Sequence, residues 1–207
     1  VSGHINKIIR ILEQADAQSL VILDELCAGT DPQEGAALAR SLLTYLLERG
    51  GRVIVTSHLG RPKGNRDPHL SLEPVARHLG ELLDRPVRFC PQLIGPEARK
   101  AVDDLQDGEV LLLENTRFEE GEKKNDPELS EALASLGDLF VHDAFGAAHR
   151  AHASTVGAAE VLRGKGKEVV GGFLMEKEVR YLGMALGAPA RPFVAVLGGA
   201  KISGKID

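Results

Sequence analysis

Short apolar runs alternate along the chain with segments whose apolar residues recur at helical period. This alternation is typical of strands and helices built around a parallel sheet. The predicted strands are Leu20–Asp24, Val53–Thr56, Val110–Leu113, Leu139–His142, Phe193–Leu197 and a weaker one, Val87–Phe89. The predicted helices are Ile5–Ala15, Gln33–Glu48, Leu72–Leu83, Pro127–Leu136 and Leu174–Leu186. The pattern predicts a three-layer α/β domain with a mainly parallel sheet and helices on both faces.

Composition narrows the class of protein. The 207 residues are 43% hydrophobic and 27% charged, as in ordinary globular proteins, and the net charge of −5 argues against a nucleic-acid partner. Cys27 and Cys90 have no spacing that suggests a disulfide framework or a zinc site, so no metal site is expected. No apolar run is long enough to span a membrane, and the first residues do not resemble a signal peptide. We expect a cytoplasmic protein, monomeric and without a membrane partner.

Three predicted strands are each followed by a loop that carries cations. These cations are His58, Arg61, Lys63, Arg117, His149, Arg150 and His152. Ligands bind beyond the carboxyl ends of strands in open α/β sheets, and the guanidinium fork suits phosphate and carboxylate groups. The pattern therefore indicates a site for a small, multiply charged anion, although a single loop arginine is more often only solvated.

Longer motifs then point to a family. They read TSHLGRPKG (56–64), LLLENTRFEEGEKKND (111–126), DAFGAAHRAHAST (143–155), GFLMEKEV (172–179) and GGAKISGKI (198–206). In this order and spacing they resemble phosphoglycerate kinase. The resemblance implies two Rossmann-like domains joined by a hinge, the first binding 3-phosphoglycerate and the second MgATP or MgADP. Closure of the hinge would allow phosphoryl transfer to the carboxylate of the substrate.

The resemblance also implies roles for individual residues. It implies that the substrate is bound by His58, Leu59, Gly60, Arg61, Arg117 and Arg150. Nucleotide binding falls to Gly198, Gly199, Lys201 and Lys205, and catalytic roles fall to Arg61, Lys201 and Lys205. Most of the nucleotide domain lies beyond residue 207 in the family. We therefore expect no tight nucleotide binding and little or no activity from these 207 residues alone.

Residues 1–50 follow a different pattern. LVILDE and AGTDP in this segment are similar to the ATPase domain of MutS-type proteins, which makes Asp24 and Glu25 a Walker B remnant. The Walker A sequence GxxxxGK[ST] occurs nowhere in the 207 residues, so ATP hydrolysis by this segment is not expected. The Asp, Asn and Arg substrate contacts that family members carry at their start are also absent. The chain therefore looks like a recombined or deliberately built chimera, and a natural fusion or a misassembled gene would give the same pattern.

The expected organisation has four parts. Residues 1–50 form a MutS-like helix–strand–helix segment that completes the sheet, and 51–172 form the phosphoglycerate kinase N-terminal domain. Residues 173–190 form an interdomain-type helix, and 191–207 begin the nucleotide domain. Two other functions stay open: a fold chimera without activity, and a MutS-like ATPase or DNA-repair fragment.

Several polar residues have plainer interpretations. Glu119–Asp126 is expected to be a solvated acidic loop, and Arg163–Lys167 a flexible surface loop. His142 is expected to be packed or hydrogen-bonded rather than catalytic. His149 and His152 are interpreted as groups that support the site.

Overall fold

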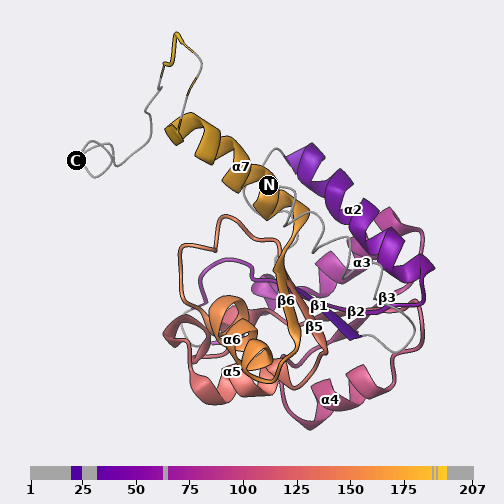
Figure 1. The fold of residues 1–207 in the computed structure, drawn as a ribbon. Helices are drawn as coiled ribbons and strands as arrows, with labels where there is room; N and C mark the ends of the chain where they lie inside the picture. Colours follow the sequence, from indigo (N-terminus) through magenta and orange to yellow (C-terminus); the bar gives the residue numbers. More distant parts are fainter. Residues whose placement is uncertain (1–19, 25–31, 63–64, 188, 190, 195–207) are drawn as a thin grey trace.

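A computed structural model describes residues 20–24, 32–62, 65–187, 189 and 191–194 (Figure 1). The strands are β1 (Leu20–Asp24), β2 (Arg52–Thr56), β3 (Val87–Cys90), β4 (Val110–Leu113), β5 (Leu139–His142) and β6 (Glu168–Gly171). The helices are α2 (Pro32–Glu48), α3 (Glu73–Leu83), α4 (Pro96–Asp103), α5 (Pro127–Ala134), α6 (Ala158–Gly164) and α7 (Phe173–Gly187). Short helical turns are η1 (Pro68–Leu70), η2 (Thr116–Phe118), η3 (Glu122–Lys124) and the π-helical turn η4 (Ala153–Gly157).

The strands form one sheet in the order β3-β4-β2-β1-β5-β6, and each pairs with its neighbours in parallel. β1 therefore lies inside the sheet, between β2 and β5. Its last residue, Asp24, is level with Thr56 on one side and His142 on the other. Because the strands are parallel, the loops that follow β2, β4 and β5 all leave from the same edge of the sheet.

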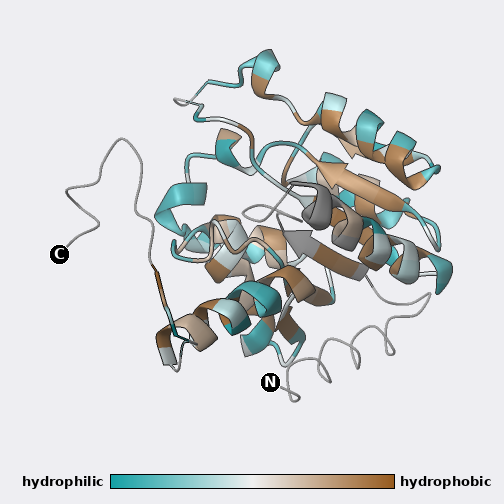
Figure 2. Cartoon of the chain, turned by 90° about the horizontal axis from the view of Figure 1, so that it is seen from above, coloured by the Kyte–Doolittle hydropathy of each residue, from teal (hydrophilic) through white to brown (hydrophobic). Residues whose placement is uncertain are grey.

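Successive residues of the strands feed two apolar layers, as the two-residue period of a strand requires. Ile22, Ile54 and Phe140 pack with α4, α5 and α6, whereas Val21, Val53 and Val141 pack with α2 and α3. Helices thus cover both faces (Figure 1). Figure 2 shows the hydropathy of each residue, with the described strands mainly apolar and the turns mainly polar. The predicted three-layer α/β domain is confirmed.

Asp143 anchors α7 to the end of β5. Its carboxylate is 2% exposed, and its Oδ1 accepts a hydrogen bond of 2.8 Å from the backbone N of Met175. Burial raises the pKa of the Asp143 carboxyl, while the amides of Met175 and Leu174 oppose that rise. Gly172 must be glycine, because a Cβ there would lie 2.2 Å from Cγ of Asp143.

The sequence predicted most elements in place. The strands over 20–24, 53–56, 87–89, 110–113 and 139–142 are present, each within a residue or so of its expected ends. The structure adds α4, α6 and β6, which were not predicted. Phe193 and Val194 are not in a strand, so that part of the last predicted strand is wrong. The remainder of that strand and the predicted helix Ile5–Ala15 lie outside the described residues.

Within the described ranges, no helix has both the length and the apolar character needed to cross a membrane.

Candidate functional site

A buried polar pair at the end of β4 holds the loop that follows β2. Glu114, 6% exposed, accepts hydrogen bonds from Oγ of Ser71 at 2.8 Å and from the backbone N of Leu72 at 2.9 Å. Asn115 is fully buried, and its Nδ2 donates to the backbone O of Leu59 and of Leu70, both at 2.9 Å. These bonds satisfy groups that would be costly to bury alone. They fix the backbone around Leu59–Arg61 against the sheet.

Arg117 joins the loop after β4 to the loop after β2. Its backbone N donates to Oδ1 of Asn115 at 3.0 Å, and its Nη1 donates to the backbone O of Gly60 at 2.8 Å. Gly60 has a φ of +64°, and a Cβ there would lie 2.6 Å from Cδ2 of Leu70. Nε of Arg117 is buried and has no hydrogen-bond partner among the described residues. Nε is thus a buried donor without a partner in the described part of the chain.

Electrostatic effects show that the cations of the three loops lie close together. The pKa of His58 is lowered to about 4, first by burial and then by Arg117, His152, Arg150 and Lys123. The pKa of Arg117 is also lowered, first by burial and then by Arg150 and Arg61, with Glu122 acting in the opposite direction. Like charges disfavour one another only at short range in salt solution. Arg61 and Arg150 therefore both lie near Arg117, beyond the carboxyl edge of the sheet.

The loop after β5 contributes both exposed and buried groups. Nε of Arg150 donates to Nε2 of His149 at 3.0 Å, and both side chains are exposed. His152 is 7% exposed, with its Nδ1 3.7 Å from Oε1 of Glu122. His142 is half-buried at the end of β5. His149 thus contacts Arg150 and His152 contacts Glu122. Their interpretation as groups that support the site stays a prediction.

The segment Glu119–Asp126 is not a solvated acidic loop, so that expectation was wrong. Glu122 is 2% exposed, Glu119 pairs with Arg66 at 3.0 Å, and Oδ1 of Asp126 caps α5 by accepting from the backbone N of Leu129 at 2.9 Å. Glu119, Glu122 and Asp126 thus each have a defined partner, whereas Glu120 is exposed. The local sequence suggested a solvated loop because the partners of these acidic residues are distant along the chain or are backbone groups.

The remaining predicted residues divide into two groups. Leu59 is 40% exposed and Arg61 is exposed, both beside Gly60 in the loop after β2. Asp24 ends β1 at the same edge of the sheet. The other predicted residues lie outside the described part of the chain: Glu25, Lys63, Gly198, Gly199, Lys201 and Lys205. In the described residues, no group of three or more His, Cys, Asp or Glu side chains is placed to hold a metal ion.

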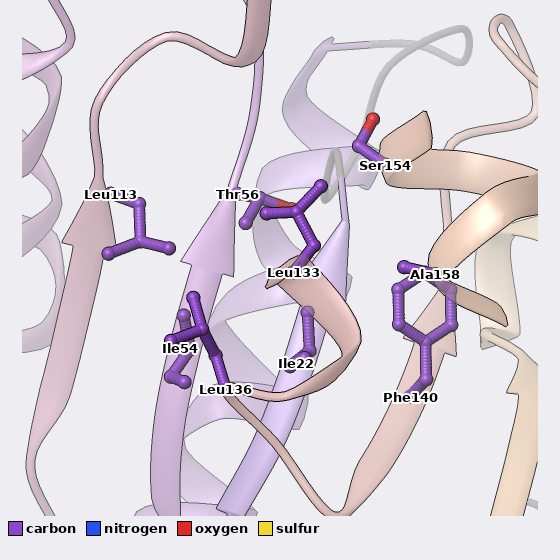
Figure 3. Close-up of a pocket in the computed structure, with 9 residues that line it drawn as sticks. All are labelled: Ile22, Ile54, Thr56, Leu113, Leu133, Leu136, Phe140, Ser154 and Ala158. Atoms are coloured by element: carbon purple, nitrogen blue, oxygen red, sulfur yellow. The ribbon is translucent and has the colours of Figure 1, made fainter. Parts of the chain in front are cut away.

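The small apolar cavity against the sheet is not the site. Figure 3 shows Ile22, Ile54, Leu133 and Phe140 facing one another around it. Its volume of about 10 Å³ is at the lower limit for a single water, and its lining is nearly all apolar. We interpret it as a packing defect of the core.

The lowered pKa of His58 predicts a pH dependence. Between pH 6.5 and about 4 the unfolded chain binds a proton at this residue that the folded chain does not. The free energy of unfolding is therefore expected to fall as the pH drops through this window, and to fall less in His58→Asn. An NMR titration of the ring should give a midpoint near 4. A midpoint near the ordinary value of 6.5 would contradict the crowded cationic environment.

The fold and this edge define the class: a doubly covered parallel α/β domain whose cationic loops gather at the carboxyl ends of its strands. The family model "Phosphoglycerate kinase" matches residues 33–207, and the model "MutS domain V" matches residues 3–61. The chain belongs to the phosphoglycerate kinase family. The two matches overlap over residues 33–61, so no single boundary at residue 50 separates them.

Similar proteins agree with the family. The chain is 59% identical over 162 residues to a phosphoglycerate kinase of Chlorobium phaeobacteroides (strain BS1), covering 78% of this chain and 40% of that protein. It is 51% identical over 186 residues to one of Lactobacillus delbrueckii subsp. lactis, covering 86% and 46%. The solved phosphoglycerate kinase from Pyrococcus horikoshii OT3 matches with a TM-score of 0.74 at 36% identity, covering 89% of this chain and 47% of that one. The chain thus spans less than half the length of these relatives.

Proposed function

We propose that this chain binds 3-phosphoglycerate at the edge where its cationic loops meet, as the substrate domain of a cytoplasmic glycolytic phosphoglycerate kinase. The observation that carries the proposal is that Arg61 and Arg150, from the loops after β2 and β5, both lower the pKa of Arg117 in the loop after β4. The ligand has a phosphate and a carboxylate, and guanidinium groups can donate paired hydrogen bonds to both.

In the reaction, these residues would bind and orient the substrate rather than form bonds with it. Phosphoryl transfer depends mainly on positioning and on cations that stabilise developing charge. Arg61, His58, Leu59, Gly60, Arg117 and Arg150 form the substrate group of the proposal. The family uses MgATP or MgADP, which supplies or accepts the phosphoryl group. Gly198, Gly199, Lys201 and Lys205 are proposed to meet the nucleotide phosphates, on the strength of their motif alone.

We propose that α7 is the interdomain helix of the family. Val179, Tyr181, Leu182 and Met184 are each about half exposed on it, and Leu186 is 87% exposed. A helix that displays this many large apolar side chains is typical of an element with a further packing partner. The anchoring of its first turn by Asp143 would transmit the position of the sheet edge to that partner.

We further infer that the segment before β2 derives from a MutS-type ATPase, which makes the chain a chimera. The overlap of the two family models on α2 and β2 supports this, because a shared helix–strand unit can be exchanged without changing the hydrophobic period. β1 then completes the sheet with a strand of foreign origin. We propose no ATP hydrolysis by Asp24 and Glu25, since the 207 residues contain no Walker A sequence.

Calorimetric titration with 3-phosphoglycerate tests the proposal. We expect saturable binding that weakens with added salt, because it rests on ionic contacts. The affinity should be weaker than that of an intact phosphoglycerate kinase by about 2–5 kcal/mol, since family substrate contacts at the start of the chain are replaced. Glycerate, which lacks the phosphate, is the matched control and should bind at least about tenfold more weakly. Absence of binding, or equal binding of glycerate, would contradict the proposal.

A further inference from the structure

Glu122 is a buried carboxylate that connects two of the cationic loops. It opens η3 on the loop that also carries Arg117, and it is 2% exposed. Its Oε2 accepts from the backbone N of Ser154 at 3.0 Å, and its Oε1 accepts from Oγ of Ser154 at 2.6 Å. Ser154 belongs to η4, on the segment after β5. A buried carboxylate is tolerated only when such bonds replace water, so this contact defines how the two loops sit together.

The segment that Glu122 holds is tied to itself by further bonds. Oγ1 of Thr155 donates to the backbone O of Arg150 at 3.2 Å and accepts from the backbone N of His152 at 3.2 Å. The His152 side chain in turn accepts from the backbone N of Thr155. Figure 3 shows the Ser154 hydroxyl directed away from the apolar core. Fixing Ser154 therefore fixes the backbone of Arg150 as well.

The charge of Glu122 and its hydrogen bonds are expected to have opposite effects on the affinity for an anion. Its carboxylate lies close enough to raise the pKa of Arg117, against the effect of Arg150 and Arg61. A negative charge beside an anion site repels the anion, so neutralising Glu122 would by electrostatics alone tighten binding. If the carboxylate instead holds the cations in place, its loss must weaken binding. The two roles predict opposite signs.

We propose that Glu122 is a positioning residue of the anion site, holding the segment of Arg150 and His152 against the loop of Arg117. A site whose cations are held together before the ligand arrives loses less free energy in ordering them. This proposal rests on the proposed function. It adds that the cations of the anion site are held in place by the buried contact of Glu122 with Ser154 before the ligand binds.

The test is the affinity for 3-phosphoglycerate of Glu122→Gln, which keeps the shape of the side chain but removes the charge. We expect binding about tenfold weaker than in the wild-type chain, because a small displacement of Arg150 is costly to binding. In an Arg150→Ala background the same change should alter the affinity less than about twofold. Asp143→Asn is the matched control, since it also neutralises a buried carboxylate that holds backbone, and it should leave the affinity unchanged.

Equal or tighter binding by Glu122→Gln would overturn the proposal, as would an undiminished effect in the Arg150→Ala background. If Glu122→Gln does not fold, Ser154→Ala removes one of the two donors and should weaken binding about threefold. If the wild-type chain binds no 3-phosphoglycerate, the proposed function fails. The positioning role is then judged by amide hydrogen exchange, which Glu122→Gln should accelerate over residues 150–155 and Asp143→Asn should not. Equal exchange in the two variants would overturn it.

Discussion

Replacing Arg117 with alanine is expected to weaken 3-phosphoglycerate binding by about 10- to 150-fold, which corresponds to about 1.5–3 kcal/mol for a charge-assisted contact. Two losses combine in this variant. The ligand loses a guanidinium charge, and the loop after β2 loses the bond from Nη1 to the backbone O of Gly60. Calorimetric titration of the purified variant measures the change.

Two companion variants make this result specific. Arg117→Lys keeps the charge without the planar fork and should fall between the wild-type chain and Arg117→Ala. Arg77→Ala removes an exposed arginine on α3 that pairs only loosely with Glu73, at 3.8 Å, and should bind like the wild type. Similar losses in Arg77→Ala and Arg117→Ala would show that the effect is one of net charge, against the proposed site.

Replacing Ile22 with alanine is expected to lower the free energy of unfolding by about 2–5 kcal/mol, the usual range for truncating a large aliphatic core residue. Ile22 is 4% exposed and packs with Ile54 and Phe140 beneath the sheet. It lies on β1, before the residues that match phosphoglycerate kinase. A large loss would show that this strand is an integral part of the sheet. Urea unfolding measures it.

The control for this stability prediction is Leu186→Ala. Leu186 is 87% exposed on α7, so its truncation should change the free energy of unfolding by less than about 0.5 kcal/mol. An equally small change in Ile22→Ala would mean that β1 does not complete the core. The proposal that β1 takes the place of a strand of the family in this sheet would then be wrong.

The strands that could be predicted from the sequence are those with continuous apolar runs, such as Val110–Leu113, which is buried on both faces. The missed elements α4, α6 and β6 are short, with at most eight residues each. α4 has eight residues and buries only Ala98 and Val102, and β6 has four residues, none of them fully buried. Their positions depend on packing against neighbours distant in the chain, which no local pattern records.

The site also has residues that the sequence predicted and residues that it did not. That cations follow β2, β4 and β5 could be predicted, because strand ends and basic residues are both visible in the sequence. The groups that hold the loops, Glu114, Asn115 and Glu122, were missed because an acidic or amide residue in a polar run usually faces water. The signal available for Glu114 and Asn115 was their place directly after a fully apolar strand. Glu122 offered no such signal, since its partner Ser154 lies 32 residues further along the chain.

The most direct measurement of the central claim follows backbone amide resonances during a titration with 3-phosphoglycerate. If the cations of three loops form one site, the amides of Gly60, Arg117 and Arg150 should shift together with a single dissociation constant. Amides on α4, such as that of Arg99, should not move. Shifts confined to one loop, or different constants for the three, would contradict a common anion site.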